Sequence, residues 1–263
     1  MKPNYKNWMP KGLILSMLCG GLVSLVLALT FGLSGLLPEG TLRLVLLAAS
    51  SALAALLLLA ALWMLLLYRA FSYNGRRQMA RQIVDGVAAL VSLPEGGEGL
   101  DVGCGSGALT IACARRNPWA LMLGIDRWGR DYASFSQALC ERNADAEGVG
   151  NIRFAKGNAL RLDFPDERFD AVVSNYVYHN IPSHDRQAIL LESLRVLKKG
   201  GVFAIHDVFS RMNYGDMRVF VQKLIGMGYE RVELLDTTQG RFMSQGEALW
   251  MRLGGSALLV GKK

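Results

Sequence analysis

The sequence predicts an α/β protein with a doubly wound, seven-stranded, mostly parallel sheet, preceded by two transmembrane helices. The first part of the chain contains two apolar segments without a charged residue, 12–37 and 44–68. The rest alternates short apolar runs, typical of strands, with amphipathic runs, typical of helices. One of these short runs leads into the glycine-rich sequence GLDVGCGSGALTIA at 99–112. A strand, a glycine loop and a helix in this order are typical of nucleotide-binding sheets.

The two apolar segments predict transmembrane helices at about 12–37 and 43–68, within an N-terminal anchor of residues 1–70. Each is longer than the roughly 20 residues that cross a bilayer core. A secretory signal peptide is the alternative for the first segment, but its apolar region would span about 7–15 residues and end at a small-residue cleavage site. The greater length and the second span favour a hairpin anchor.

Basic residues on the flanks predict the orientation of this hairpin. Three lysines precede the first span and four arginines follow the second, whereas the connecting loop contains only Arg43: Lys2, Lys6, Lys11, Arg69, Arg76, Arg77 and Arg81. The positive-inside rule therefore puts both termini and the following domain in the cytoplasm. Aromatic residues occupy expected interfacial positions: Tyr5, Trp8, Trp63 and Tyr68. The absence of an organelle-targeting leader suits a bacterial inner membrane.

Small residues recur at four-residue intervals in the first span: Gly20, Ser24, Ala28 and Gly32. Such a stripe lets two membrane helices approach closely. We expect it to face the second span of the same chain, and a homodimer through the membrane helices is the alternative.

Charge and cysteine content exclude two other classes of protein. The chain has a net charge of +7, but residues 1–81 hold eight basic side chains and one acid, so the remaining residues are balanced. The positive charge thus belongs to the membrane flanks, where it favours anionic headgroups, and nucleic-acid binding is not expected. Cys19, Cys104, Cys113 and Cys140 show no C-x-x-C pairing, so neither a disulfide framework nor a metal site is predicted.

The second domain is expected to span residues 71–263 and to begin with a helix at 73–93. Further helices are predicted at 108–116, 131–147, 184–197 and 216–227. Strands are predicted at 100–102, 121–125, 152–155, 171–174, 202–206, 231–235 and 257–260. In such a sheet, ligands bind at the carboxyl ends of the strands, which is where the glycine loop lies.

The glycine loop and the acid after the next strand predict a nucleotide or nucleoside site. Gly103, Gly105 and Gly107 allow a ligand to approach the backbone closely. Asp126 ends the following strand, where a carboxylate accepts hydrogen bonds from ribose hydroxyls. Spacing alone does not identify the ligand, because Gly103-x-Gly105-x-x-Ala108 also fits a dinucleotide fingerprint.

The order of the motifs resembles the class I S-adenosylmethionine-dependent methyltransferases. LDVGCGSG is similar to their first motif, GID to the end of their second strand, GNALRLDFPDERFDAVVSN to their third and fourth strands, and RVLKKGGVFAIHD to their fifth strand and the helix before it. The resemblance extends from about Gly75 to the C-terminus and omits the hairpin. It implies a Rossmann-like methyltransferase fold with S-adenosylmethionine as cofactor and S-adenosylhomocysteine as product.

The resemblance also implies roles for individual residues. Asp101, Gly103 and Gly105 would surround the methionine end, Cys104 of the same loop would contact the cofactor, and Asp126 would hold the ribose. Residues beside the adenine would be Arg127 or Trp128, Asn158 and Ala159. Asn158 replaces the acid that is common at this position, so its contact differs from the family pattern. Asn175 and Tyr176 would flank the reactive methyl group.

A methyltransferase needs a general base only when the acceptor must lose a proton. His179, with Tyr176 nearby, is the candidate, and His206 is the second choice. The alternative for both histidines is a structural hydrogen bond. His184 is expected at a helix start, and Cys104 is expected to be a small buried side chain rather than a nucleophile.

Two segments are candidates for acceptor recognition. One is the helix at 73–93, because the segment before the first motif often serves this family as a lid. The other is 241–255, whose apolar residues either pack on the sheet or form a rim that faces the bilayer. The sequence predicts a membrane-anchored methyltransferase of a lipophilic acceptor, such as a phospholipid, a quinone or another isoprenoid. The alternatives are a cofactor-binding membrane sensor, a methyltransferase of a soluble molecule or membrane protein, and a nicotinamide-dependent oxidoreductase.

Overall fold

The computed structural model describes residues 2–34, 38–129 and 134–263. The chain divides into two compact units. One unit is the segment Asn7–Gln78, and the other joins residues 2–6 to Met79–Lys263. The first residues of the chain therefore belong to the same unit as the second part of the chain, whereas the apolar segments form a unit of their own.

The Asn7–Gln78 unit is a pair of long helices, α1 (Lys11–Leu33) and α2 (Thr41–Phe71). Their most apolar stretches have mean hydropathies of 2.4 and 2.5, and both helices are long enough to cross a membrane. The predicted end of the first span at 35–37 lies outside the described residues. The predicted start of the second at 43 differs by two residues from the observed helix, because Gly40 ends the connecting loop.

The small residues of α1 face α2 of the same chain. Ser24 and Ala28 are buried, and a Cβ added to Gly21 would lie 2.8 Å from the side chain of Leu58. A Cβ added to Gly20 would lie 3.3 Å from Leu57. The stripe is thus used within the hairpin, as expected, and the homodimer stays a prediction.

Polar and aromatic contacts hold both ends of the hairpin. Arg43 caps α1 by donating from Nε to the carbonyl of Phe31 (2.9 Å) and from Nη2 to that of Gly32 (2.6 Å). These bonds satisfy carbonyls that a helix end leaves unpaired. At the open end, the Lys11 ammonium lies 5.4 Å from the centre of the Tyr68 ring.

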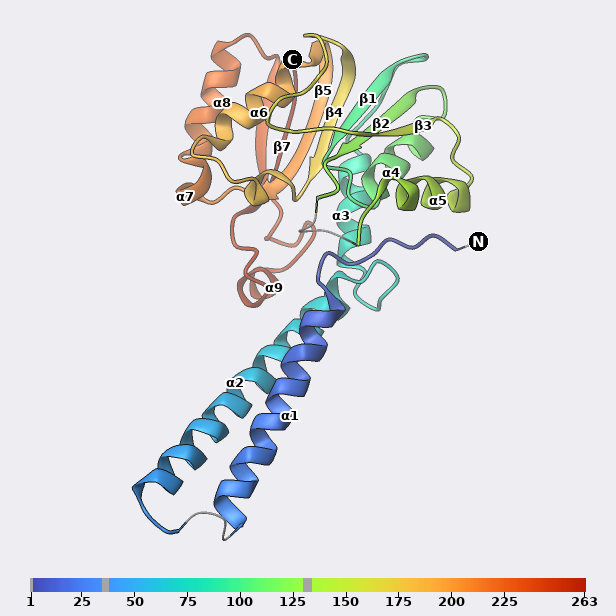
Figure 1. The fold of residues 1–263 in the computed structure, drawn as a ribbon. Helices are drawn as coiled ribbons and strands as arrows, with labels where there is room; N and C mark the ends of the chain where they lie inside the picture. Colours follow the sequence, from blue (N-terminus) through green and yellow to red (C-terminus); the bar gives the residue numbers. More distant parts are fainter. Residues whose placement is uncertain (1, 35–37, 130–133) are drawn as a thin grey trace. The chain divides into compact units, whose positions relative to one another are not determined.

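A seven-stranded sheet within the described residues organises the second unit (Figure 1). Its order is β3-β2-β1-β4-β5-β7-β6, and β7 runs antiparallel to both of its neighbours. The other pairs are parallel. The strands are β1 (Glu98–Val102), β2 (Leu121–Asp126), β3 (Ile152–Lys156), β4 (Phe169–Asn175), β5 (Leu197–Val208), β6 (Arg231–Asp236) and β7 (Ser256–Lys262). The predicted mostly parallel, doubly wound sheet is confirmed.

The helices of this unit are α3 (Met79–Ala88), α4 (Ala108–Arg116), α5 (Gln137–Glu147), α6 (Arg186–Arg195), α7 (Arg211–Tyr214), α8 (Met217–Gly226) and α9 (Gln245–Trp250), with the 3-10 turn η2 (Tyr178–Asn180). The helix expected at 73–93 is shorter in the structure because Gln78 has a positive φ of 49° and the chain tightens after Ala88. The helix expected from 131 begins at Gln137, capped by Ser136, and 131–133 lie outside the described residues. The turns α7, η2 and α9 were not expected.

Alternation along β5 directs its side chains to the two faces of the sheet. Phe203 and Ile205 of β5 pack with α6 and α8 in one continuous apolar core. Ala204 and His206 alternate with them and therefore point to the opposite face. Figure 1 shows α3, α4 and α5 grouped away from α6 and α8.

Candidate active site

The glycine loop joins β1 to α4 in a shape that side chains would block. Gly103, Gly105 and Gly107 have φ angles of 79°, 56° and 82°, in a region that residues with a Cβ rarely adopt. A Cβ on Gly103 would also overlap the side chain of Val177, which follows β4. The N–H of Gly103 donates to the carbonyl of Ile125 at 2.8 Å. The loop is therefore held at the carboxyl ends of β1, β2 and β4.

Asp126 ties this loop to the end of β2. Its Oδ2 accepts from the N–H of Gly105 at 2.9 Å, and its Oδ1 accepts from the N–H of Trp128 at 2.8 Å. The Trp128 indole in turn donates to the carbonyl of Gly105 at 3.0 Å. Each carboxylate oxygen can accept a further bond, so the geometry positions Asp126 and keeps acceptor capacity for hydroxyl groups.

Asp101 lies just before the loop and is only 1% exposed. Burial raises the pKa of its carboxyl to about 7, the Thr110 hydrogen bond opposes this shift, and the nearby Asp126 carboxylate adds to it. Thr110 Oγ1 donates to Oδ2 at 2.6 Å. A buried carboxyl with this pKa changes its protonation readily, and a cation placed beside it would favour the carboxylate.

The residues predicted beside an adenine meet at the ends of β2 and β3. The N–H of Gly157 donates to the carbonyl of Asp126 at 2.9 Å, which brings Asn158 and Ala159 close to Asp126. The Asn158 side chain is exposed, and its Oδ1 accepts from the N–H of Leu160 at 3.1 Å. Arg127 is exposed and Trp128 half-buried. The predicted set therefore borders one end of the sheet.

Asn143 of α5 connects the first residues of the chain to the glycine loop, which sequence reasoning missed. Its Nδ2 donates to the carbonyl of Ser106 at 2.9 Å, and its Oδ1 accepts from the N–H of Asn4 at 2.7 Å. The side chain is 2% exposed. An isolated asparagine in a helix carries no sequence signal for this role, because both partners are distant along the chain.

Asn175 and His206 lie opposite each other at the ends of β4 and β5. His206 Nδ1 lies 2.9 Å from Asn175 Oδ1, and Nε2 lies 3.0 Å from Thr237 Oγ1. Burial lowers the pKa of His206 to about 3. Since both ring nitrogens are engaged and the ring stays neutral, His206 has the geometry of a structural histidine rather than a base.

Tyr176 follows Asn175 with a φ of 56°, which is unusual for a residue with a side chain. Its hydroxyl lies 2.9 Å from Ser256 Oγ, and its ring packs edge-on against those of His206 and His179. Burial raises the pKa of the phenol, which therefore stays protonated at neutral pH. Tyr176 lines the site as a neutral aromatic side chain.

His179 of η2 pairs with Asp207 at the end of β5. His179 Nδ1 lies 2.5 Å from Asp207 Oδ1, and the histidine side chain is 26% exposed while the aspartate is fully buried. The N–H groups of Tyr178 (2.8 Å) and Val208 (2.6 Å) also donate to this carboxylate. This arrangement orients the imidazole and supports a proton on Nδ1, which makes Nε2 the basic nitrogen. Asp207 was missed in the sequence, although it directly follows a residue that was considered.

Phe242 and α3 form a wall beside His206. The Phe242 ring centre lies 5.3 Å from that of His206, and the rings are nearly perpendicular. A Cβ on Gly86 of α3 would overlap the Phe242 ring. The two segments predicted to recognise the acceptor thus meet at this side chain.

The remaining candidates lie outside this chemistry. Burial raises the pKa of the Cys104 thiol well above its usual value, which disfavours a thiolate nucleophile. His184 is exposed and precedes the helix cap Asp185. Across the described ranges, no group of three or more His, Cys, Asp or Glu side chains is arranged to hold a metal ion.

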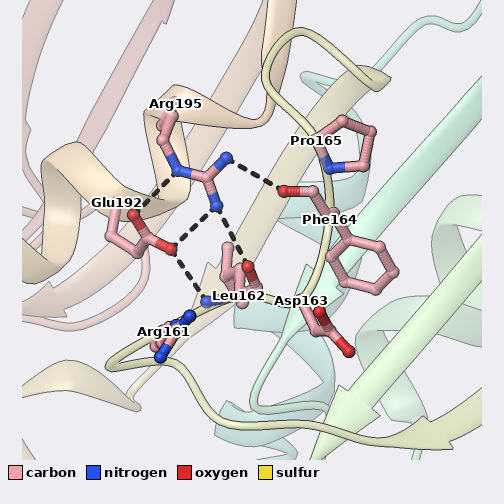
Figure 2. A pocket seen from close by; sticks show the side chains of 7 residues that line it. All are labelled: Arg161, Leu162, Asp163, Phe164, Pro165, Glu192 and Arg195. Carbon is pink, nitrogen blue, oxygen red and sulfur yellow. Dashed lines mark hydrogen bonds and ion pairs between the residues drawn. The ribbon is translucent and has the colours of Figure 1, made fainter.

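A separate hollow of about 470 Å³ lies between the β3–β4 connection and α6 (Figure 2). Its Arg195 guanidinium contacts Glu192 (2.9 Å) and the carbonyls of Leu162 (3.0 Å) and Phe164 (2.9 Å). The arginine hydrogen bond lowers the pKa of Glu192. The charged groups are thus used to hold a loop onto a helix, and the lining contains no predicted site residue.

Comparison with known proteins identifies the class. Residues 100–205 match the family model described as a methyltransferase domain. The chain is 28% identical over 167 residues to a demethylmenaquinone methyltransferase of Geobacillus kaustophilus, which covers 60% of this chain and 69% of that protein. It is 34% identical over 136 residues to the enzyme of the same name from Thermus thermophilus, covering 52% and 56%.

Solved structures share the fold. The [4+2]-cyclase SpnF aligns with a TM-score of 0.55 at 22% identity, over 72% of this chain and 83% of that one. The phosphoethanolamine N-methyltransferase 2 of Haemonchus contortus, in complex with S-adenosylhomocysteine, aligns with a TM-score of 0.51 at 16% identity, over 72% and 53%. The fold and the glycine-loop site define a nucleotide-cofactor-binding α/β protein. More particularly, residues 100–205 form a methyltransferase domain of the class I S-adenosylmethionine-dependent type, with S-adenosylmethionine as cofactor.

Proposed function

We propose that this protein is a membrane-anchored methyltransferase that acts on a lipophilic quinol. The observation that carries the proposal is that one chain joins a methyltransferase domain to two apolar helices of bilayer length. The resemblance to enzymes named demethylmenaquinone methyltransferases favours a quinone-type acceptor over a phospholipid or another isoprenoid. Demethylmenaquinone carries an isoprenoid tail, so an acceptor of this kind resides in the bilayer.

The residues at the glycine loop fit the cofactor. Gly103 and Gly105 allow its methionine end to approach the backbone, and Asp126 has acceptor capacity for the ribose hydroxyls. Asp101, with its raised pKa, suits the positively charged end of the cofactor, because a nearby cation favours its carboxylate. Cys104 would add only backbone and packing contacts.

The other contacts to the cofactor extend from the same edge of the sheet. Trp128 or Arg127 would lie beside the adenine, with Asn158 and Ala159 on its other side. Asn175, held by His206, would border the methyl group. When bound, the cofactor supplies a methyl group on a sulfonium, which is already activated for transfer.

His179 would act as the general base. With Nδ1 directed at Asp207, its Nε2 is the nitrogen that can accept a proton from the acceptor hydroxyl. The deprotonated acceptor would then bond to the methyl group that the cofactor supplies, with S-adenosylhomocysteine as the leaving group. If the acceptor atom is a ring carbon, its own proton would leave and the oxygen would regain one, so that the quinol hydroxyl is restored and one proton is released overall. Tyr176, neutral and packed against His179, would border the position of the acceptor.

The hairpin would anchor the enzyme with both termini in the cytoplasm, as the basic flanks predict. Lys11 and Arg69 lie at the open end of the hairpin, and Arg43 lies at the closed end, where its guanidinium is used to cap α1. A single capping arginine opposes translocation less than the cluster at the other end. An inner-membrane, multi-pass location is therefore proposed.

The test uses the full chain in lipid nanodiscs with methyl-tritiated S-adenosylmethionine. The acceptor is a chemically reduced naphthoquinone with an isoprenoid tail and an unsubstituted ring position, compared with the same ring without the tail. We expect label in the tailed quinol, a much lower rate for the tailless ring, and loss of label in His179→Gln. A matched control is His184→Gln, an exposed histidine outside the site.

Other outcomes would redirect the proposal. Label in phosphatidylethanolamine or in protein, with none in the quinol, would assign a different acceptor. Equal rates for both quinols would favour a soluble acceptor, and cofactor binding without transfer to any acceptor would favour a membrane sensor.

A further inference from the structure

The connection between β6 and β7, residues 237–255, is attached to the candidate site at its base. Thr237 Oγ1 lies 3.0 Å from His206 Nε2, and Thr237 also donates to the carbonyl of Ser256 at 2.9 Å. Ser256 Oγ lies 2.9 Å from the Tyr176 hydroxyl. Thr237 therefore contacts His206, which holds Asn175, and Ser256, the first residue after the connection, contacts Tyr176. Asn175 and Tyr176 are the residues proposed to border the methyl group.

The middle of this connection, residues 241–252, contains helix α9 and exposes apolar side chains; we call this segment the tip. Helix α9 begins with a reciprocal capping box between Ser244 and Glu247. Met243 before the helix and Met251 after it are buried, whereas Leu249 is 81% exposed and Trp250 is 38% exposed. The two sequence alternatives for this segment thus both occur, because some apolar residues pack inward while Leu249 and Trp250 face out.

Charge around the tip favours an anionic surface. Arg241 and Arg252 flank α9 in the sequence, and both side chains are exposed. The carboxylate of Glu247 accepts hydrogen bonds from the N–H and hydroxyl of Ser244, so it is engaged in the cap. An exposed leucine and tryptophan between two arginines match the chemistry of a lipid interface, where aromatic and apolar side chains insert and basic ones meet phosphates.

We propose that Leu249 and Trp250 dock onto the bilayer surface, with Arg241 and Arg252 on anionic headgroups. The inference rests on the proposed anchoring of the same chain. Docking of this tip would hold the connection that contains Phe242, and with it Tyr176 at the edge of the candidate site, near the membrane surface. A lipophilic acceptor can then reach His179 without leaving the bilayer entirely.

The test places an environment-sensitive fluorophore at the tip of the full chain. Leu249→Cys is introduced together with Cys19→Ser, which removes the exposed native cysteine, and is labelled with NBD. The same label at Val219→Cys, 66% exposed on α8, is the matched control. The protein is reconstituted into nanodiscs of equimolar phosphatidylcholine and phosphatidylglycerol, with or without lipids that carry a spin label near the headgroup.

We expect the label at position 249 to emit at shorter wavelength than in detergent and to be quenched by the spin-labelled lipid. The label at position 219 should show neither change, and quenching at 249 should weaken when phosphatidylglycerol is omitted. Leu249→Glu should raise the KM for the tailed quinol and leave S-adenosylhomocysteine binding unchanged, whereas Val219→Glu should change neither.

Two results would overturn the docking. An unquenched label at 249 in protein that floats with liposomes and methylates the tailed quinol would remove the docking and leave the proposed function standing. Protein that fails to float with liposomes would remove the anchoring and the docking together.

Discussion

Replacement of Asp126 by alanine tests the cofactor site at its most connected residue. The carboxylate accepts from the N–H groups of Gly105 (2.9 Å) and Trp128 (2.8 Å), and we propose that it also accepts from the ribose. Hydrogen bonds to a charged group contribute about 1.5–3 kcal/mol each. Loss of one such bond to the ligand therefore weakens binding by about 10- to 150-fold.

The assay is calorimetric titration of the purified full chain with S-adenosylhomocysteine. Asp126→Asn keeps one oxygen that can accept from the loop, so its loss of affinity should be smaller than that of Asp126→Ala. Asp163→Ala removes an exposed carboxylate that lines the hollow of Figure 2 and should bind normally. Affinity within twofold of the native protein for Asp126→Ala, in a folded sample, would refute the assignment.

Three further predictions concern protonation of site residues. Because burial raises the pKa of Asp101 to about 7 and a cationic ligand favours its carboxylate, binding of S-adenosylmethionine should release a proton near neutral pH and tighten as pH rises. Calorimetry in buffers of different ionisation enthalpy measures the released proton, and Asp101→Asn should abolish the release. His206 has a pKa of about 3 in the folded protein against an ordinary 6.5, so it stabilises the fold above 6.5 and this contribution falls as pH drops, by about 2 kcal/mol at about pH 5. Urea unfolding should therefore show a weaker acid dependence in His206→Gln, and an unchanged dependence would contradict the pKa. His179→Gln should lower kcat by about 10²- to 10⁴-fold with little change in cofactor affinity, and a native single-turnover rate would remove it as the base.

Local patterns of apolar and polar residues were sufficient to predict the positions of most strands of the sheet. The predicted strand at 121–125 differs by one residue from β2, and the predicted helix at 108–116 has the observed bounds of α4. Apolar runs bounded by polar turns carry this information within a few residues of sequence. The prediction that Gly103 and Asp126 belong to one cofactor site followed from the rule that ligands bind at the carboxyl ends of parallel strands.

Errors arose where the backbone departs from the pattern of side chains. Apolar residues continue at helical spacing beyond Ala88, yet the bonds of Leu90 to Val87 and of Val91 to Ala88 span only three residues, so α3 ends earlier. The short α9 has too few residues for a helical period to be recognised. Its capping pair, Ser244 and Glu247, was the available signal.

The partners of site residues could not be inferred from one sequence. His179 and Asp207 are 28 residues apart, and they meet because β4 and β5 are neighbours in register, with Asn175 opposite His206. Asn143 joins Asn4 to the glycine loop across a still longer separation. Contacts of this kind depend on strand order and helix packing, which the spacing of residues along the chain does not specify.

Methyl transfer to a lipophilic acceptor is tested most directly by incubating the detergent-purified full chain with methyl-tritiated S-adenosylmethionine and membranes from its source, followed by organic extraction. We expect label in the organic phase that disappears with Asp126→Ala and co-migrates with a methylated quinone. Label confined to the aqueous or protein phase would contradict a lipophilic acceptor while retaining methyl transfer.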